Sequence, residues 1–342
     1  MGNKHVSLKD LAKELNVSIS TVSRALKDHP DISVEVRKKV KQLAKARNYT
    51  PNPLAMGLLK QETKMIGVIV PDLVTHFYAS VISGIESFAD EKGFFTIIAS
   101  SEESYKKETE ALKNLLNARV EGIIVCLSME TKQFTHFKKL LDDEIPLVFF
   151  DRICLEGQAP CVTVDNKDAS LNVIKHLKSQ GYKRIAFISG PPHLNISKER
   201  LNGYLDGLKE CGYPESKELI EICNLSYISA SSAMKRLLDL NHPPDAVFCV
   251  NDTVAFAAMK VIKSKGLNIP RDVGLVGFTD DFHATVVEPT LTSITHPTNK
   301  IGRKAASLFF EKLNNNQTTK LAVLKTKLVV RESSTRKKAG EL

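Results

Sequence analysis

The chain has 342 residues, of which 42% are hydrophobic and 25% are charged. These fractions are typical of a globular protein and exclude an extensively disordered one, and the length indicates two to three domains. The formal net charge of +9 is placed unevenly, because residues 1–60 hold 12 Lys and Arg but only 5 Asp and Glu. Residues 331–342 carry +2 and the segment 61–330 is neutral. A basic head on a neutral body suggests that only the head meets a polyanion.

Several protein classes are disfavoured by the same sequence. The first 30 residues hold no apolar run of signal-peptide length, and no run approaches the ~18 residues of a membrane span. The six cysteines are scattered without a Cys-x-x-Cys pair, which predicts reduced, buried thiols and disfavours a disulfide framework or a zinc site. We therefore expect a cytoplasmic protein with no membrane contact, no metal and no cofactor.

Three short helices are predicted in residues 1–50. Ser7 followed by Asp10 is a capping signal, and Ser18 and Ser33 precede the second and third helices. The apolar positions recur at helical spacing: Leu8, Leu11, Ala12 and Leu15, then Val22, Ala25 and Leu26, then Val36, Val40, Leu43 and Ala44. Two short helices around a tight turn, closed by a third, indicate a helix-turn-helix module. A plain three-helix bundle with a solvated basic face is the alternative.

The outer face of the second helix is predicted to carry small, polar and basic side chains, which suit a helix lying in a major groove. These residues are Ile19, Ser20, Ser23, Arg24 and Lys27. The segment that follows the head, 51–60, contains a good N-cap in Asn52 before Pro53. Such a short helix is marginal in water by itself, so it needs support from a partner. A simple linker is the alternative.

From residue 65 onwards, short β-rich runs alternate with helix-length stretches. Strands are predicted at 65–70, 94–99, 122–126, 146–150, 161–164, 184–188, 219–223, 245–250, 273–278 and 290–294. Helices are predicted at 80–92, 106–117, 166–180, 197–211, 230–240, 252–265 and 299–313. Alternation of this kind predicts parallel sheets covered on both faces. The number of strands favours two doubly wound sheets over one.

The head resembles the lac-repressor/galactose-repressor family of bacterial transcription regulators. The resemblance is carried by residues 6–13 (VSLKDLAK), 17–26 (VSISTVSRAL) and 48–52 (NYTPN), and it continues along nearly the whole chain. It implies that Ile19, Ser20 and Arg24 read base edges of double-stranded operator DNA. Ile19 can make only apolar contacts, whereas Arg24 is suited to a bidentate guanine contact. Further implied DNA contacts, several of them to phosphates, are Ser7, Leu8, Ser18, Thr21, Ser23, Lys27, Ser33 and Tyr49.

The resemblance also gives the segment after the head a role. In the family, the matching segment folds on DNA, pairs with its dimer mate and inserts a leucine into the minor groove. Here Leu58 is the implied wedge, beside Ala55, with Asn52 at the start of the helix. Met56 and Leu59 stand where polar or basic residues are common in the family, so fewer phosphate contacts are available.

For the body, the resemblance implies the type I periplasmic-binding-protein fold with three chain crossings between two lobes. The implied boundaries are 1–50 for the head, 51–62 for the hinge, 63–162 plus 292–324 for the first lobe, and 163–291 plus 325–342 for the second. Ligands of such folds bind beyond the carboxyl ends of the strands. The positions implied for an effector there are Phe77, Tyr78, Asp151, Arg200, Asn251, Thr279 and Asp280.

Two departures from the family bear on the effector. Thr279 stands where the family often has Asp, and Asp280 could substitute from one residue further along. Leu194 and Ile196 stand where purine-sensing relatives carry polar groups. A sugar or sugar derivative is therefore favoured over a purine.

These features favour a sequence-specific transcription regulator, acting as a repressor and a homodimer, whose operator affinity responds to a small molecule. An activator and a regulator that depends on a corepressor protein remain alternatives. So does a ligand-binding protein without a regulatory role, which the basic head argues against. An enzyme is disfavoured because no dinucleotide loop, P-loop or nucleophile elbow occurs.

Overall fold

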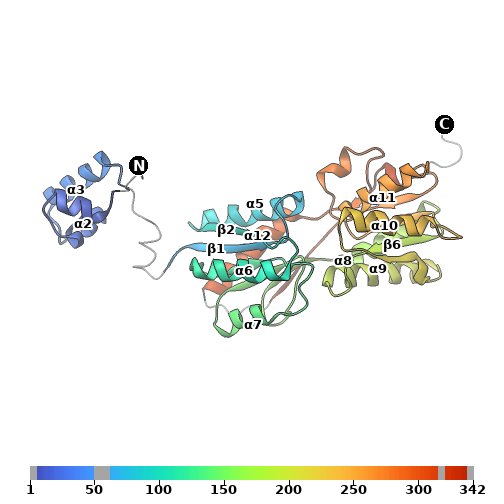
Figure 1. Cartoon of the computed structure of the whole chain (residues 1–342), viewed down its shortest axis with the longest axis horizontal. Helices are drawn as coiled ribbons and strands as arrows, with labels where there is room; N and C mark the ends of the chain where they lie inside the picture. Colours follow the sequence, from blue (N-terminus) through green and yellow to red (C-terminus); the bar gives the residue numbers. More distant parts are fainter. Residues whose placement is uncertain (1–5, 50–61, 315–319, 337–342) are drawn as a thin grey trace. The chain divides into compact units, whose positions relative to one another are not determined.

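The structure, a computed structural model, describes residues 6–49, 62–314 and 320–336. The chain falls into two compact units that meet at Thr63 and Lys64, and each is described by itself. Residues 1–5, 50–61, 315–319 and 337–342 are drawn as a grey trace in Figure 1. The implied contacts of Asn52, Ala55 and Leu58 lie outside the described residues.

The first unit is a bundle of three helices: α1 (Leu8–Glu14), α2 (Ile19–Leu26) and α3 (Val34–Ala46). Each begins after a serine whose side chain accepts a backbone N–H, as the sequence predicted. At α1 the bond is reciprocal, because the Asp10 carboxylate accepts from the backbone N–H of Ser7 at 2.9 Å. Such caps satisfy N–H groups that a helix terminus leaves unpaired.

One small apolar core holds these helices together. Its buried residues are Leu11, Ala12, Val22, Ala25, Val40 and Ala44, with Leu8, Leu15, Val36 and Leu43 packed around them. The predicted inner faces are therefore confirmed. Because one stripe of each helix is buried, the opposite stripe of α2 is left at the surface.

The second unit contains two parallel sheets, and each belongs to one lobe. The first lobe has a six-stranded sheet in the order β11-β5-β4-β3-β1-β2. Its strands are β1 (Met65–Val70), β2 (Phe95–Ser100), β3 (Ile123–Val125), β4 (Leu147–Phe150), β5 (Cys161–Val164) and β11 (Leu321–Leu324). Successive residues point to opposite faces and both faces are apolar, as expected for a sheet covered twice.

Helices cover both faces of this sheet. On one face, α5 (His76–Glu91) and α12 (Thr298–Leu313) pack against alternate strand residues such as Val68 and Val148. A side chain on Gly84 of α5 would collide with the Asn299 carbonyl of α12, so glycine permits this close approach. On the other face lie α6 (Tyr105–Asn117) and α7 (Thr135–Asp142).

The sequence did not predict α7, β11 or the short strand β12 (Leu328–Val329). The helix α7 has only eight residues and no side-chain cap, and it is held by the burial of Phe137 and Leu140. Isolated helices of this length are marginal, so its stability comes from packing on the sheet.

The second lobe has a four-stranded parallel sheet in the order β7-β6-β8-β9. Its strands are β6 (Ile185–Ser189), β7 (Ile220–Ile222), β8 (Ala246–Cys249) and β9 (Gly274–Val276). Figure 1 shows the paired helices α8 (Asn166–Ser179) and α9 (Asn195–Cys211) on one side of β6, and α10 (Tyr227–Leu238) and α11 (Asp252–Ser264) on the other. The predicted α/β class with two doubly wound sheets is confirmed.

The connections between the lobes include a two-stranded antiparallel ribbon of β10 (Ser293–Ile294) and β12. The whole of β5 pairs within the first sheet, and α8 follows it at Asn166. The residue boundaries assigned to the lobes from the sequence stay a prediction. No helix among the described residues is long and apolar enough to cross a membrane.

Candidate functional site

The exposed side of α2 forms the first candidate site. Its N-cap hydroxyl, on Ser18, accepts from the backbone N–H of Thr21 at 3.0 Å and contacts the hydroxyls of Ser20 and Thr21 at 2.7 and 2.8 Å. Ile19 beside them is 47% exposed. Arg24 and Lys27 are exposed and have no ion pair among the described residues. Cations that lack a protein partner are available to phosphates or base edges.

The other residues implied for DNA contact have structural roles in the head. Ser7 is engaged in the capping box, and Ser33 caps α3 by accepting from Val36. Leu8 and Tyr49 are half-buried against the core of the head, and Ser23 is half-buried on α2. Contact between any of these side chains and DNA stays a prediction.

The second candidate site is a cavity of about 140 Å³ in the second unit. Residues from both lobes line it, and most follow the carboxyl end of a strand, where ligands of open parallel sheets bind. Most of the positions implied for an effector line this cavity: Phe77, Tyr78, Asp151, Arg200, Asn251 and Thr279. Their contact with an effector stays a prediction.

Asp280 is the exception among these positions, and its contact with an effector also stays a prediction. It does not line the cavity, because its carboxylate forms an ion pair with Arg331 at 2.7 Å. The backbone at Asp280 has a φ of 52°, and the next residue, Asp281, lines the cavity instead. Sequence spacing could not show which of two adjacent acids faces inward.

Arg200 is the buried cation of the cavity, with 2% of its surface exposed. Its Nε donates to the Asn166 side chain at 2.8 Å and its Nη1 donates to the Val250 carbonyl at 2.6 Å. The guanidinium also lies over the Phe278 ring at 3.7 Å. Burial lowers the pKa of Arg200 to about 10, so the side chain stays charged at neutral pH.

Asp151 and His296 face each other beside this cation without a hydrogen bond. His296 Nε2 lies 3.8 Å from Asp151 Oδ1, and neither ring nitrogen has a hydrogen-bond partner among the described residues. Burial, aided by the Arg200 charge, holds the pKa of His296 well below its ordinary value. Burial also raises the pKa of Asp151, against the pull of Arg200 and Arg152. A buried polar group without a partner is costly, so this pair is suited to a ligand that both donates and accepts.

Asp252 fixes the loop that carries Thr279 and Asp281. Its Oδ1 accepts from the Ser293 hydroxyl at 2.6 Å, and its Oδ2 accepts from the backbone N–H of Asp281 at 2.7 Å. Burial raises the pKa of Asp252 to about 6. Because Ser293 belongs to β10, the loop is tied directly to a segment that connects the lobes.

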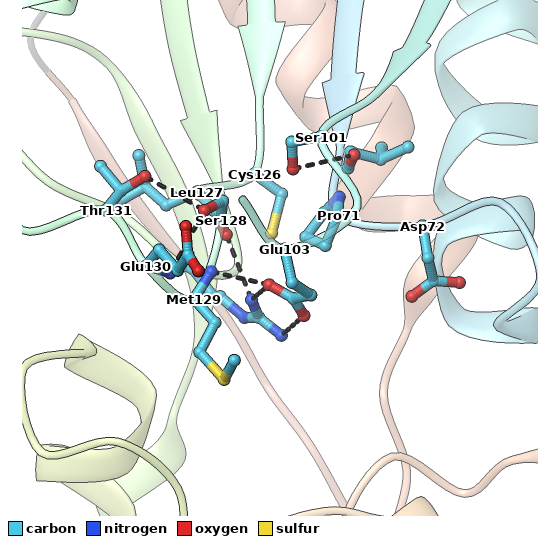
Figure 2. A network of polar contacts seen from close by, with 12 residues as sticks. Pro71, Asp72, Ser101, Glu103, Cys126, Leu127, Ser128, Met129, Glu130 and Thr131 are labelled. Carbon is cyan, nitrogen blue, oxygen red and sulfur yellow. Dashed lines mark hydrogen bonds and ion pairs between the residues drawn. The ribbon is translucent and has the colours of Figure 1, made fainter. Parts of the chain in front are cut away.

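A network of polar contacts borders the cavity on the first lobe. Arg152 donates two hydrogen bonds to the Glu103 carboxylate, at 2.7 and 2.9 Å. Arg152 also donates to the Leu127 carbonyl at 3.2 Å, and Glu103 accepts from the backbone N–H of Met129 at 2.6 Å. Figure 2 shows Glu103 among the backbone of Leu127, Ser128 and Met129. The ion pair thereby ties together the loops that follow β2, β3 and β4.

The sequence did not single out several of the lining residues, among them Glu103 and His296. A usable signal was present for two of them. Glu103 follows the strand predicted at 94–99 and His296 follows the one predicted at 290–294, so the rule of strand carboxyl ends would have included both. Arg152 adjoins Asp151, but nothing in the sequence showed which residue would be paired.

A helix-turn-helix head and a two-lobed core with a cavity between its sheets define a regulator-like architecture. The model for "Bacterial regulatory proteins, lacI family" matches residues 7–52. The model for "Periplasmic binding proteins and sugar binding domain of LacI family" matches residues 63–331. The chain therefore belongs to the LacI family.

Similar proteins agree with this assignment. Catabolite control protein A of Priestia megaterium is 33% identical over 91% of this chain and 93% of its own length. The transcriptional repressor CytR of Escherichia coli K12 is 31% identical over 90% of this chain and 89% of its own. This chain is accordingly a DNA-binding transcriptional regulator.

Solved structures show the same fold. A cellobiose complex of the transcriptional regulator CelR has a TM-score of 0.73 at 29% identity and covers 96% of this chain and 99% of its own. The lac repressor dimer bound to operator and an anti-inducer has a TM-score of 0.85 at 24% identity, over 97% and 100% of the two chains.

Proposed function

We propose that this protein is a repressor whose affinity for operator DNA is set by a small sugar or sugar derivative bound in the cavity. The observation that carries the proposal is the buried group of Arg200, Asp151 and His296, which offers a cation, a carboxylate and a neutral imidazole around one small space. A sugar hydroxyl both donates and accepts, so it can satisfy such a set. The aromatic rings of Phe77 and Tyr78 add an apolar wall.

The cavity also limits the size and charge of the effector. Its volume of about 140 Å³ lies below the ~300–1,000 Å³ of pockets for drug-sized ligands, which favours a monosaccharide. Ile196, which stands where purine-sensing relatives carry a polar group, lines the cavity, and this supports a sugar over a purine.

On DNA, we infer that Ile19, Ser20 and Arg24 read bases, while Ser18, Thr21 and Lys27 set the register on phosphates. Two heads are needed to read the two halves of a palindromic site, and exposed apolar side chains on the core support a homodimer. In the second lobe these include Ile228 at 78% exposure and Phe282 at 61%, and in the first lobe Phe95 at 66%. Large exposed apolar side chains such as these are candidates for an association surface. A chromosomal DNA ligand supports a cytoplasmic location.

The dimer is tested by analytical ultracentrifugation of the full chain. Ile228→Glu combined with Phe282→Glu should give monomers, because a charge buried in an apolar interface is unpaired. Val323→Glu, at an exposed position on β11, is the control and should leave the dimer intact. A double variant that remains dimeric would exclude Ile228 and Phe282 from the dimer interface.

The function itself is tested by selecting bound sequences from random DNA and measuring their affinity with and without a panel of sugars. We expect a near-palindromic site and at least one sugar that changes the affinity. Binding should also weaken steeply with salt, because phosphate contacts release counterions. A slope near zero for the logarithm of the binding constant against the logarithm of the salt concentration would reject DNA binding. If no sugar in the panel changes the affinity for DNA, the proposal of a sugar effector is rejected.

A further inference from the structure

The backbone of Met129 lies between the two lobes and is held by both. Within the first lobe, its N–H donates to Glu103 at 2.6 Å, and Glu103 is fixed in turn by Arg152. From the second lobe, the Nε2 of His193 lies 2.7 Å from the Met129 carbonyl oxygen. A carbonyl can only accept, so His193 donates from Nε2. Figure 2 shows Met129 next to Glu103, with a dashed line for the hydrogen bond between them.

A second bridge between the lobes lies close to the first. Asn195, the first residue of α9, accepts from the backbone N–H of Ile153 at 3.0 Å and donates to the Asp151 carbonyl at 3.1 Å. One amide side chain therefore holds the backbone on both sides of Arg152. His193 and Asn195 come from one short segment between β6 and α9, and we name this pair the clasp.

The clasp borders the candidate effector cavity. Asp151, Arg152 and Glu103 line the cavity, and the same three residues position the groups that the clasp holds. Separation of the lobes would break the bonds of both His193 and Asn195, because each joins backbone of the first lobe to a side chain of the second. The clasp is therefore present only in a closed arrangement of the lobes.

We propose that His193 is a positioning residue that holds the lobes closed over the cavity through its bond to Met129. The inference deepens the proposed function and rests on it for the identity of the ligand as an effector. Glu103 both lines the cavity and fixes Met129, so a ligand that binds Glu103 acts on the same contact. A hydrogen bond of ordinary net strength shifts the open-to-closed ratio by roughly 2- to 12-fold.

The test measures lobe separation in the ligand-free full chain. Lys132 and Lys198 are exposed and lie near the clasp on opposite lobes, and all six native cysteines are buried. Spin labels on Lys132→Cys and Lys198→Cys report the distance distribution by pulsed electron resonance. We expect a narrow distribution in the parent protein, and a severalfold larger population at long distance in His193→Ala.

Two further variants separate the hydrogen bond from a general loss of packing. His193→Gln keeps a donor at a similar reach and should restore the narrow distribution. His242→Ala removes an exposed histidine elsewhere in the second lobe and should change nothing. Melting temperatures of all variants are measured, and since His193 is only half-buried we expect them to agree within a few degrees.

The outcomes are distinguishable from failure of the proposed function. A distribution in His193→Ala that matches the parent, or a glutamine variant as broad as alanine, would overturn the clasp. If the distances respond as expected but no sugar alters DNA binding, the role of His193 in the clasp is supported and the proposal of a sugar effector is rejected. If a sugar alters DNA binding but His193→Ala leaves the distances unchanged, the sugar effector is supported and the role of His193 is rejected.

Discussion

The two candidate sites are assembled in opposite ways. On the head, the exposed residues Ile19, Ser20, Arg24 and Lys27 lie within nine consecutive positions on one helix and its C-cap. In the core, the cavity brings Phe77 of α5 together with Asp151, Arg200 of α9 and His296 near β10. A local site depends on one helix being exposed, whereas a dispersed site depends on the packing of both lobes.

This difference also appears in their electrostatics. Arg24 and Lys27 are solvated cations, and the exposed ion pairs of the head, such as Lys41 with Asp28, contribute little to stability. In the core, Arg200, Asp151, Asp252 and His296 are buried, and burial shifts the pKa of each. Substitutions of these solvated cations on the head should therefore affect DNA binding alone, whereas substitutions of the buried groups in the core should affect both ligand binding and stability.

The largest effect is expected at Arg200. Truncation of a buried, hydrogen-bonded charge costs roughly 2–5 kcal/mol or more. Arg200→Ala should therefore lower the affinity for the sugar that alters DNA binding at least about thirtyfold. Operator affinity without sugar should stay within about threefold, because the head is unchanged. Titration of the selected operator against the sugar gives both values. A normal response of the Arg200→Ala protein to the sugar would show that Arg200 does not bind the effector.

Asp252 gives the next largest effect, through pH. Its folded-state pKa of about 6 lies above the ordinary value of 3.8, so the folded protein binds the proton more tightly. This contribution to the free energy of unfolding is complete below about pH 4 and is lost as the pH rises through about 6. Between pH 4 and pH 7, the free energy of unfolding of the parent protein should fall by up to about 3 kcal/mol more than that of Asp252→Asn.

Urea unfolding of both proteins across this pH range measures the difference. Asp272→Asn is the control, because Asp272 is only half-buried in its ion pair with Arg271, and the hydrogen bond from Arg271 lowers its pKa. Parallel pH profiles of the parent and Asp252→Asn would show that Asp252 does not titrate in this range.

The third prediction concerns Arg24, an exposed residue of the head whose replacement should affect DNA binding but not stability. A bidentate base contact contributes roughly 1–3 kcal/mol of discrimination, so Arg24→Ala should lower operator affinity about 5- to 150-fold. Non-specific DNA affinity should fall far less, and the melting temperature should not change. Lys45→Ala, an exposed cation on α3, is the control for charge alone. Equal losses of affinity for operator and for random DNA would show that Arg24 contacts phosphates and not bases.

The smallest effect is expected at Ser7. Replacement of an N-cap serine by alanine costs about 1 kcal/mol, so Ser7→Ala should speed amide exchange in α1 without changing exchange in the core. Hydrogen exchange of the full chain, read by mass spectrometry, measures this. Accelerated exchange in β1 or α5 would show that the head and the core are not independent in stability.

Much of the fold followed from local patterns. The three head helices, the strands of the second sheet and all strands of the first sheet except β11 were predicted, because caps and period are properties of neighbouring residues. The elements that were missed, α7 and β11, are short and depend on contacts with distant strands. Most implied effector positions line the cavity because the carboxyl ends of parallel strands meet at one edge of a sheet.

By itself, the sequence determined the class of fold, the helix-turn-helix head and the face of α2 that meets solvent. These depend on charge distribution, capping and the period of apolar residues along the chain. Only the tertiary structure decided that Asp281 faces the cavity while Asp280 pairs with Arg331, and that His193 bonds to Met129 across the lobes. Such choices are made by side-chain direction and by contacts between residues far apart in the chain, which no local pattern records.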